Sequence, residues 1–214
     1  MKRRSHGRSK GGIHSESAIV VHTSLILIAV MLNISACDIF GTRDPESPTQ
    51  TSSNYRPPTQ PDIVLENLQN AVAERNSENY LRSFVDSTYS NRRFEFIPTQ
   101  EAQNQYFSVF SRWSLQSERE YFENLRAQTM PTAFSTLVFS DDRFESLQSD
   151  SAVYNANYTV VFQHGRADTP TEVRGNLLFY LAADSRNNWV IYRWIDFKTG
   201  SDFSWSELKG RFSN

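Results

Sequence analysis

The sequence predicts an α+β fold in which N-terminal helices pack on one curved antiparallel sheet. Two observations carry this prediction: apolar residues recur at helical spacing over residues 62–125, and they occupy every second position from residue 133 onward. Helices followed by sequential strands are typical of an α+β domain. Nearly all aromatic residues lie within residues 62–214. This range is therefore the predicted globular domain, because it holds the apolar surface that a core requires.

The first two helices are expected to follow each other closely. Asp62 can cap the first helix, whose apolar residues at helical spacing are Ile63, Leu65, Leu68 and Val72. Asn76 tolerates the left-handed conformation that ends a helix, and Ser77 favours a new N-terminus. The pair therefore predicts that the first helix ends here and that the second begins. The second helix carries another apolar set, Tyr80, Leu81, Phe84 and Val85.

A short strand and a third helix are expected next. Phe94, Glu95 and Phe96 alternate apolar and polar side chains before Pro98, which is typical of a strand that ends there. Residues 117–120 (SERE) have the spacing of a capping box, and they precede the apolar residues Tyr121, Phe122 and Leu125.

Strands are expected from residue 133 to residue 197. One strand places a set of apolar residues on a single face, Tyr154, Ala156, Tyr158, Val160 and Phe162. The next strand does the same with Val173, Leu177, Phe179 and Leu181. Residues 189–197 are apolar on both sides, which favours a central strand. Residues 204–207 (SWSE) form a capping box for a last short helix.

This order of elements resembles the nuclear transport factor 2-like superfamily, which includes SnoaL-like domains. The resemblance covers about residues 62–197. It rests on the long strands and on three segments, residues 67–76 (NLQNAVAERN), 80–81 (YL) and 189–194 (WVIYRW). It implies a cone whose sheet curls around the helices and leaves a pocket at its open end. Cystatin-like and lipocalin-like folds are the alternatives. Superfamily members include enzymes, binding modules and assembly partners, so the fold does not decide the function.

Residues 1–36 are predicted to be an export signal. A basic start precedes an apolar run that is densest at residues 25–32 (LILIAVML). The following residues, Ile34-Ser35-Ala36-Cys37, resemble the lipobox of bacterial lipoproteins. The resemblance implies a diacylglyceryl thioether on Cys37, cleavage before it, and a domain held outside the cytoplasm at the inner or the outer membrane. An uncleaved anchor helix is the alternative, although polar residues 22–24 interrupt the apolar run.

Residues 37–61 are predicted to be the lipidated cysteine and a disordered Pro/Ser/Thr-rich tether. Its five prolines, which remove backbone donors and favour extended conformations, are Pro45, Pro48, Pro57, Pro58 and Pro61. The alternative is that part of this segment packs along the domain.

Several kinds of site are not expected in the domain. Cys37 is the only cysteine and His164 is the only histidine after the leader, so a cysteine or multi-histidine metal site cannot form. His164, and the acidic residues Asp141, Asp142 and Glu145, are expected in solvated turns. The domain glycines are too widely spaced for a phosphate loop or a nucleophile elbow. The net charge of the chain is −2 and the domain has no basic run, so no positively charged surface for binding nucleic acid is expected. We therefore expect neither a metal nor a cofactor.

Asp196 is the one candidate for catalysis. Within the superfamily, enzymes of the ketosteroid isomerase type use a carboxylate and a tyrosine inside the cone to move a proton beside a carbonyl. Asp196 with Tyr154, Tyr158 or Tyr192 could take these roles, although the positions do not match that family's motif residue by residue. The favoured prediction is that Asp196 ends its strand at the surface.

Aromatic residues offer a second kind of site. The candidates for binding a ligand are Trp113, Tyr154, Tyr158, Tyr192 and Trp194. They would suit a small apolar ligand if they lined a cavity, and they would otherwise form the core.

The predicted function is that of a membrane-anchored lipoprotein whose domain binds a small apolar ligand or an envelope protein partner without catalysis. A proton-transfer isomerase or lyase is the alternative. A dimerisation or assembly module, with a homodimer as its product, is the second alternative.

The first testable prediction concerns processing. The mature protein should begin at Cys37 and carry thioether-linked lipid, because a thiolate can attack a lipid donor. Cys37→Ala should leave an unlipidated precursor that retains residues 1–36. Mass spectrometry of the protein from its native host checks both statements, and an intact leader or a lipid-free Cys37 in the unaltered protein would contradict them.

Overall fold

The computed structural model describes residues 53–213. The predicted signal peptide, Cys37 and the tether before Ser53 lie outside the described residues. Within residues 53–213, no helix is both long enough and apolar enough to cross a membrane.

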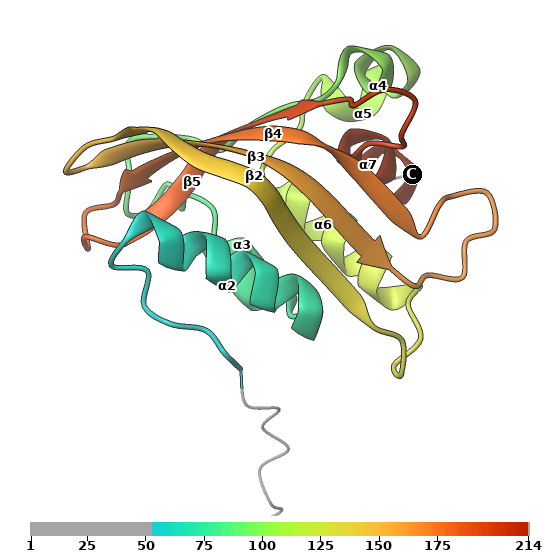
Figure 1. The fold of residues 1–214 in the computed structure, drawn as a ribbon, viewed down its shortest axis with the longest axis horizontal. Helices are drawn as coiled ribbons and strands as arrows, with labels where there is room; N and C mark the ends of the chain where they lie inside the picture. Colours follow the sequence, from blue (N-terminus) through green and yellow to red (C-terminus); the bar gives the residue numbers. More distant parts are fainter. Residues whose placement is uncertain (1–52, 214) are drawn as a thin grey trace, which may run out of the picture. The chain divides into compact units, whose positions relative to one another are not determined.

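The order of elements is the predicted one, with most helices before the strands (Figure 1). The helices are α2 (Pro61–Glu74), α3 (Ser77–Arg82), α4 (Gln100–Gln105), α5 (Phe107–Phe110), α6 (Leu115–Ala127) and α7 (Trp205–Phe212). The strands are β1 (Glu95–Ile97), β2 (Ser135–Leu147), β3 (Ser151–Phe162), β4 (Glu172–Ala183) and β5 (Trp189–Phe197). The predicted α+β fold class is confirmed.

The strands form one curved sheet in the order β1-β5-β4-β3-β2 (Figure 1). Strands β2 to β5 are antiparallel neighbours, as the sequence predicted, whereas β1 joins the β5 edge in parallel. The sheet is open, so the lipocalin-like alternative, which requires a closed barrel, is excluded.

One face of the sheet is buried and carries the core. Along β3 the side chains alternate between buried and half-buried, and the buried set is the predicted one from Tyr154 to Phe162. A period of two places alternate residues on opposite faces, so the apolar set reaches the core together. Helix α2 packs beside β2 on this side of the sheet (Figure 1).

Several helix ends differ from the predicted ones. Helix α2 begins at Pro61, which needs no amide partner at the first helical position, and Asp62 lies in the first turn instead of at the cap. The left-handed residue that ends α2 is Arg75, with φ of 52°. Asn76 instead caps α3 by accepting a hydrogen bond from the amide of Asn79. The capping box of α6 starts at Ser114, and Ser117 is its third helical residue.

The segment from Ser53 to Gln60 packs on the domain, so the packed chain begins before Asp62, the predicted boundary. The Asn67 side chain accepts a hydrogen bond from the Arg56 amide at 2.9 Å and donates to the Arg56 carbonyl at 2.6 Å. The carbonyl of Pro58 accepts a hydrogen bond of 2.7 Å from the amide of Trp189, the first residue of β5. The composition of this segment does not reveal its packing, because its partners Asn67 and Trp189 lie outside the segment.

The second prediction tests this N-terminal segment. Asn67→Ala should lower the free energy of unfolding by about 1–3 kcal/mol, because it leaves the amide and carbonyl of Arg56 without their partner. It should also speed chymotryptic cleavage after Tyr55, next to the lost contact. Urea unfolding and limited proteolysis check the two effects. Asn70→Ala, on the same helix and outside the Arg56 contact, is the control. Equal behaviour of the two variants would show that the segment contributes nothing to stability.

Candidate functional site

The C-terminal helix α7 packs against β4 and is buried in the domain. Every residue of α7 except Arg211 is buried. The Trp205 ring stands edge-on to Trp194 of β5 at 4.5 Å between centroids and packs against Tyr158 at 5.4 Å. Trp194 also touches three further rings, those of Phe84, Phe96 and Phe179, at 5.2–6.2 Å. The space around Trp194 is therefore filled by the chain's own aromatic side chains.

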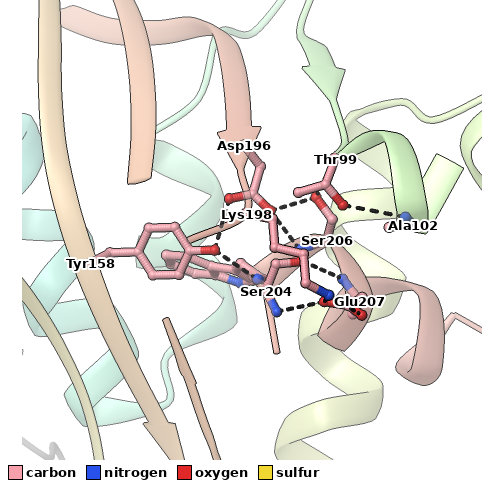
Figure 2. Close-up of polar contacts among 9 residues, drawn as sticks. Thr99, Ala102, Tyr158, Asp196, Lys198, Ser204, Ser206 and Glu207 are labelled. Carbon is pink, nitrogen blue, oxygen red and sulfur yellow. Dashed lines mark hydrogen bonds and ion pairs between the residues drawn. The ribbon is translucent and has the colours of Figure 1, made fainter. Parts of the chain in front are cut away.

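Asp196 lies inside the domain beside the first turn of α7, which overturns its predicted place at the surface (Figure 2). Its residue is only 2 % exposed. One carboxylate oxygen, Oδ1, accepts a hydrogen bond of 2.8 Å from the hydroxyl of Tyr158. The other, Oδ2, accepts from the amide of Ser206 at 2.8 Å and from the Ser206 hydroxyl. The carboxylate is thus bound by three donors of the chain itself.

The hydrogen bonds of Asp196 and Tyr158 complete the cap of α7. The Tyr158 oxygen accepts a hydrogen bond of 2.8 Å from the amide of Trp205. Ser204 and Glu207 form the predicted capping box, in which each side chain accepts from the other's amide. The amides of four successive residues, 204 to 207, therefore all have side-chain acceptors, and the negative carboxylate lies at the positive end of the helix dipole.

Gly175 provides the room for this arrangement. It pairs with Tyr158 across the strands β3 and β4. A Cβ atom at position 175 would lie 2.4 Å from the Tyr158 hydroxyl oxygen and 2.6 Å from the Phe197 carbonyl oxygen. Any larger residue would therefore displace the hydroxyl that joins Asp196 to α7.

Burial controls the ionisation of this pair. It raises the pKa of the Asp196 carboxyl from 3.8 to about 6, although the hydrogen bonds from Ser206 and Tyr158 oppose the shift. The pKa of Tyr158 is raised well above its ordinary value by burial and by the neighbouring Asp196 charge. The pair could hold and release a proton, but both carboxylate oxygens of Asp196 are already bound by donors of the chain itself.

A second buried polar group lies close by and was not foreseen. The carboxylate of Glu118 on α6 and the ammonium of Lys209 on α7 are 2.7 Å apart, and both side chains are 0 % exposed. Tyr80 and Trp113 also donate hydrogen bonds to Glu118, at 2.6 and 2.9 Å. The sequence held one signal for this pair, because Lys209 falls four residues after Trp205 on the apolar stripe of the last helix.

The proposed ligand-binding aromatics do not share one cavity. Tyr154 and Trp194 are core residues, and Tyr154 packs against Phe139 and Phe144 at 5.7 and 5.2 Å between centroids. Trp113 is partly buried and bound to Glu118. Tyr158 belongs to the cap of α7.

Tyr192 is separated from the other aromatics by a bulge. The pairing of β4 with β5 skips it, since Tyr180 pairs with Arg193 and Leu181 pairs with Ile191. Its ring is half-buried under the guanidinium of Arg92, 4.4 Å from the centroid. The bulge shifts the alternation of side chains along β5, so Tyr192 does not share the buried face that carries Trp194.

His164 is also buried, contrary to its predicted place in a solvated turn. It is 7 % exposed, and its Nε2 lies 3.1 Å from the carbonyl of Pro170. Burial lowers the pKa of its imidazole. Asp141, Asp142 and Glu145 are exposed, as predicted, but they lie within strand β2 and not in a turn. Within residues 53–213, no group of three His, Cys, Asp or Glu residues is placed to hold a metal ion.

The surface has a pocket of about 410 Å³ between α3, the start of α6 and the β4–β5 turn. Its apolar wall consists of Leu81, Phe84, Leu115 and Val190. Its charged rim consists of Glu78, Arg82, Asp86, Arg119 and Arg186. Tyr55 and Pro58 of the N-terminal segment close one side. This pocket shares no residue with the proposed aromatic site.

Comparison with known proteins gives structural likenesses alone. No family model and no curated protein match the chain. A nuclear transport factor 2-like protein from Cytophaga hutchinsonii is 13% identical, with 65% of this chain and 98% of that chain covered and a TM-score of 0.46. A proposed dehydratase of the same family from Streptomyces avermitilis is 8% identical, with 67% and 96% covered and a TM-score of 0.48.

A nuclear transport factor 2-like superfamily protein from Salmonella enterica is 10% identical, with 64% of this chain and 89% of that chain covered and a TM-score of 0.45. Because these TM-scores are below 0.5, the likenesses carry no argument about the activity of this chain. The fold assignment depends instead on the chain's own elements, helices followed by a curved five-stranded sheet.

The third prediction concerns the pH dependence of stability. Between about pH 4 and pH 6 the folded protein holds a proton on Asp196 that the unfolded chain has released. The contribution of Asp196 to the free energy of unfolding should therefore fall as the pH rises through this range, by about 3 kcal/mol in total.

Carboxyl ¹³C titration by NMR should place the midpoint of Asp196 near pH 6. Urea unfolding of Asp196→Asn should lose this part of the pH slope, whereas Asp202→Asn, on the exposed loop before α7, should keep it. A midpoint of Asp196 below about pH 4 would contradict the prediction.

Proposed function

We propose that this chain is a lipid-anchored, non-catalytic module that binds a protein partner in the cell envelope through its outer surface. The observation that carries the proposal is the position of α7 beside Asp196. Amides in the first turn of this helix donate hydrogen bonds to the Asp196 carboxylate and to the Tyr158 hydroxyl, and that hydroxyl also donates to Asp196. A general base must reach the proton that it removes. A carboxylate that is 2 % exposed and bound by three donors does not meet this condition.

The same observation favours a protein partner over a small apolar ligand. An apolar ligand requires a concave site lined mainly by apolar side chains. The aromatic residues that could form such a site pack against one another, as the four rings around Trp194 do. Binding then takes place on the outside of the domain.

The surface pocket beside α3 is the binding site that we propose. Its apolar wall offers contact area, and its rim carries three arginines. The side chains of these arginines are about half exposed: Arg82 (52 %), Arg119 (42 %) and Arg186 (46 %). Each of these guanidinium groups is paired with a carboxylate of the chain, Glu78, Glu123 or Asp184, and stays about half exposed. Together with the apolar wall they suit an acidic segment of a partner that also presents an apolar side chain. The N-terminal segment forms part of the pocket, so lipid on Cys37 would hold the site near the membrane.

The fourth prediction tests this pocket in the native host. A photo-crosslinking amino acid at position 119 should give a discrete adduct with an envelope protein, and the charge reversal Arg82→Glu should weaken that adduct at least about tenfold. The same photoreactive residue at position 143, an exposed arginine of β2 outside the pocket, is the control.

Three results would overturn the proposal. The first is equal labelling, or no labelling, from positions 119 and 143. The second is an adduct of twice the chain's own mass, which would indicate a homodimer. The third is substrate turnover by the purified protein that Asp196→Asn abolishes while the fold is intact.

A further inference from the structure

Lys209 places a charged group at the centre of an aromatic cluster. Its ammonium nitrogen lies 3.5 Å from the centroid of the Trp194 ring and 3.7 Å from that of Phe96. The rings of Trp113 and Tyr121 are 5.4 and 5.7 Å away. A cation within about 6 Å of an aromatic face is attracted by the ring quadrupole, most strongly where water is absent. We call these four rings, together with Glu118, the ammonium cage.

Nothing in the cage except its occupant comes from α7. Phe96 belongs to β1, Trp194 to β5, and Glu118 and Tyr121 to α6, while Trp113 lies two residues before α6. The backbone that carries each of these side chains therefore lies outside the last helix, although Trp205 of α7 also packs on Trp194 and donates a hydrogen bond of 2.9 Å to the Tyr121 hydroxyl. The residues of the cage thus come from the rest of the domain, and α7 contributes only the Lys209 ammonium that lies inside it.

The Glu118 carboxylate is also bound by two neutral donors. The hydroxyl of Tyr80, on α3, donates to its Oε1 at 2.6 Å, and the indole nitrogen of Trp113 donates to its Oε2 at 2.9 Å. Lys209 adds the third hydrogen bond, to Oε2 at 2.7 Å. A carboxylate fixed by neutral donors keeps its negative charge available for one cation.

The charge balance favours a cation at this position. Glu118 and, at greater range, Asp196 raise the pKa of Lys209, but burial is the larger effect and lowers it to about 8. The phenols of Tyr80 and Tyr121 also face Glu118, and burial raises both of their pKa values well above the ordinary one, so they stay neutral. At neutral pH Lys209 is therefore mainly in its ammonium form.

We propose that the interior of this domain is a binding site for a primary alkylammonium group, and that Lys209 occupies it as a covalently tethered ligand. The recognised group is the ammonium, because Glu118 and the four rings are placed around Nζ. A free amine of the same shape binds the same cage when the tethered ammonium is removed.

The fifth prediction tests this site by chemical complementation. Lys209→Ala removes Cγ, Cδ, Cε and Nζ, and n-propylammonium has the same chain of atoms. At ten times its dissociation constant, n-propylammonium should raise the Tm of Lys209→Ala by about 3–6 °C. It should leave the Tm of the unaltered protein unchanged, because a tethered ligand competes at high effective concentration.

Three controls separate charge recognition from the filling of a cavity. 1-Propanol has nearly the same shape without the charge and should rescue Lys209→Ala far less. Leu208→Ala opens space at a buried apolar residue of the same helix and should gain nothing from the amine. Adding Glu118→Gln to Lys209→Ala should abolish the rescue, since the ammonium loses its counter-charge.

The proposal is overturned if n-propylammonium raises the Tm of Lys209→Ala no more than that of Leu208→Ala, or if 1-propanol rescues equally well. If Lys209→Ala does not fold alone, refolding from urea is measured against amine concentration. Recovery that depends on n-propylammonium supports the site, and its absence at every concentration contradicts it. Neither outcome depends on a partner at the surface pocket, so this inference and the proposed function fail separately.

Discussion

Asp196 accepts hydrogen bonds from three donors, and two of them belong to Ser206 in the first turn of α7. Because the third donor, Tyr158, also accepts from the amide of Trp205, one carboxylate and one phenol complete the N-terminal cap of the helix. An uncapped helix end inside a protein leaves several amides without partners, each at a cost of about 1–3 kcal/mol. The filled interior of the domain depends on this cap.

A second ionic contact holds the same helix further along. Lys209 and Glu118 are fully buried, and isolating either charge by removal of the other costs about 3–5 kcal/mol. Both carboxylates therefore hold α7 in place, since Asp196 binds Ser206 in its first turn and Glu118 binds Lys209 near its middle. Residues that could serve proton transfer in an open cone are here engaged in holding the chain's own helix. This is the physical reason why we place binding on the outer surface.

The core around these contacts is mainly aromatic. Trp194 packs among four rings, and Tyr80 stacks on Phe122 at 3.9 Å between centroids. Such rings contribute large buried areas, and their faces also favour the Lys209 cation. Close packing extends to Gly210, where a Cβ atom would lie 2.4 Å from the Tyr106 ring. A helix that fits this closely is specified by shape as well as by charge.

The sequence by itself determined the features that depend on near neighbours in the chain. These include the helices before the strands, the buried face of β3 and the capping box of Ser204 and Glu207, because periodicity and capping involve residues a few positions apart. Tertiary structure alone decided the burial of Asp196, whose partner Tyr158 is 38 residues away, and the pairing of Lys209 with Glu118, 91 residues away. It also decided the bulge at Tyr192. The environment of a charge is set by whatever the fold brings beside it, and a local pattern does not contain that information.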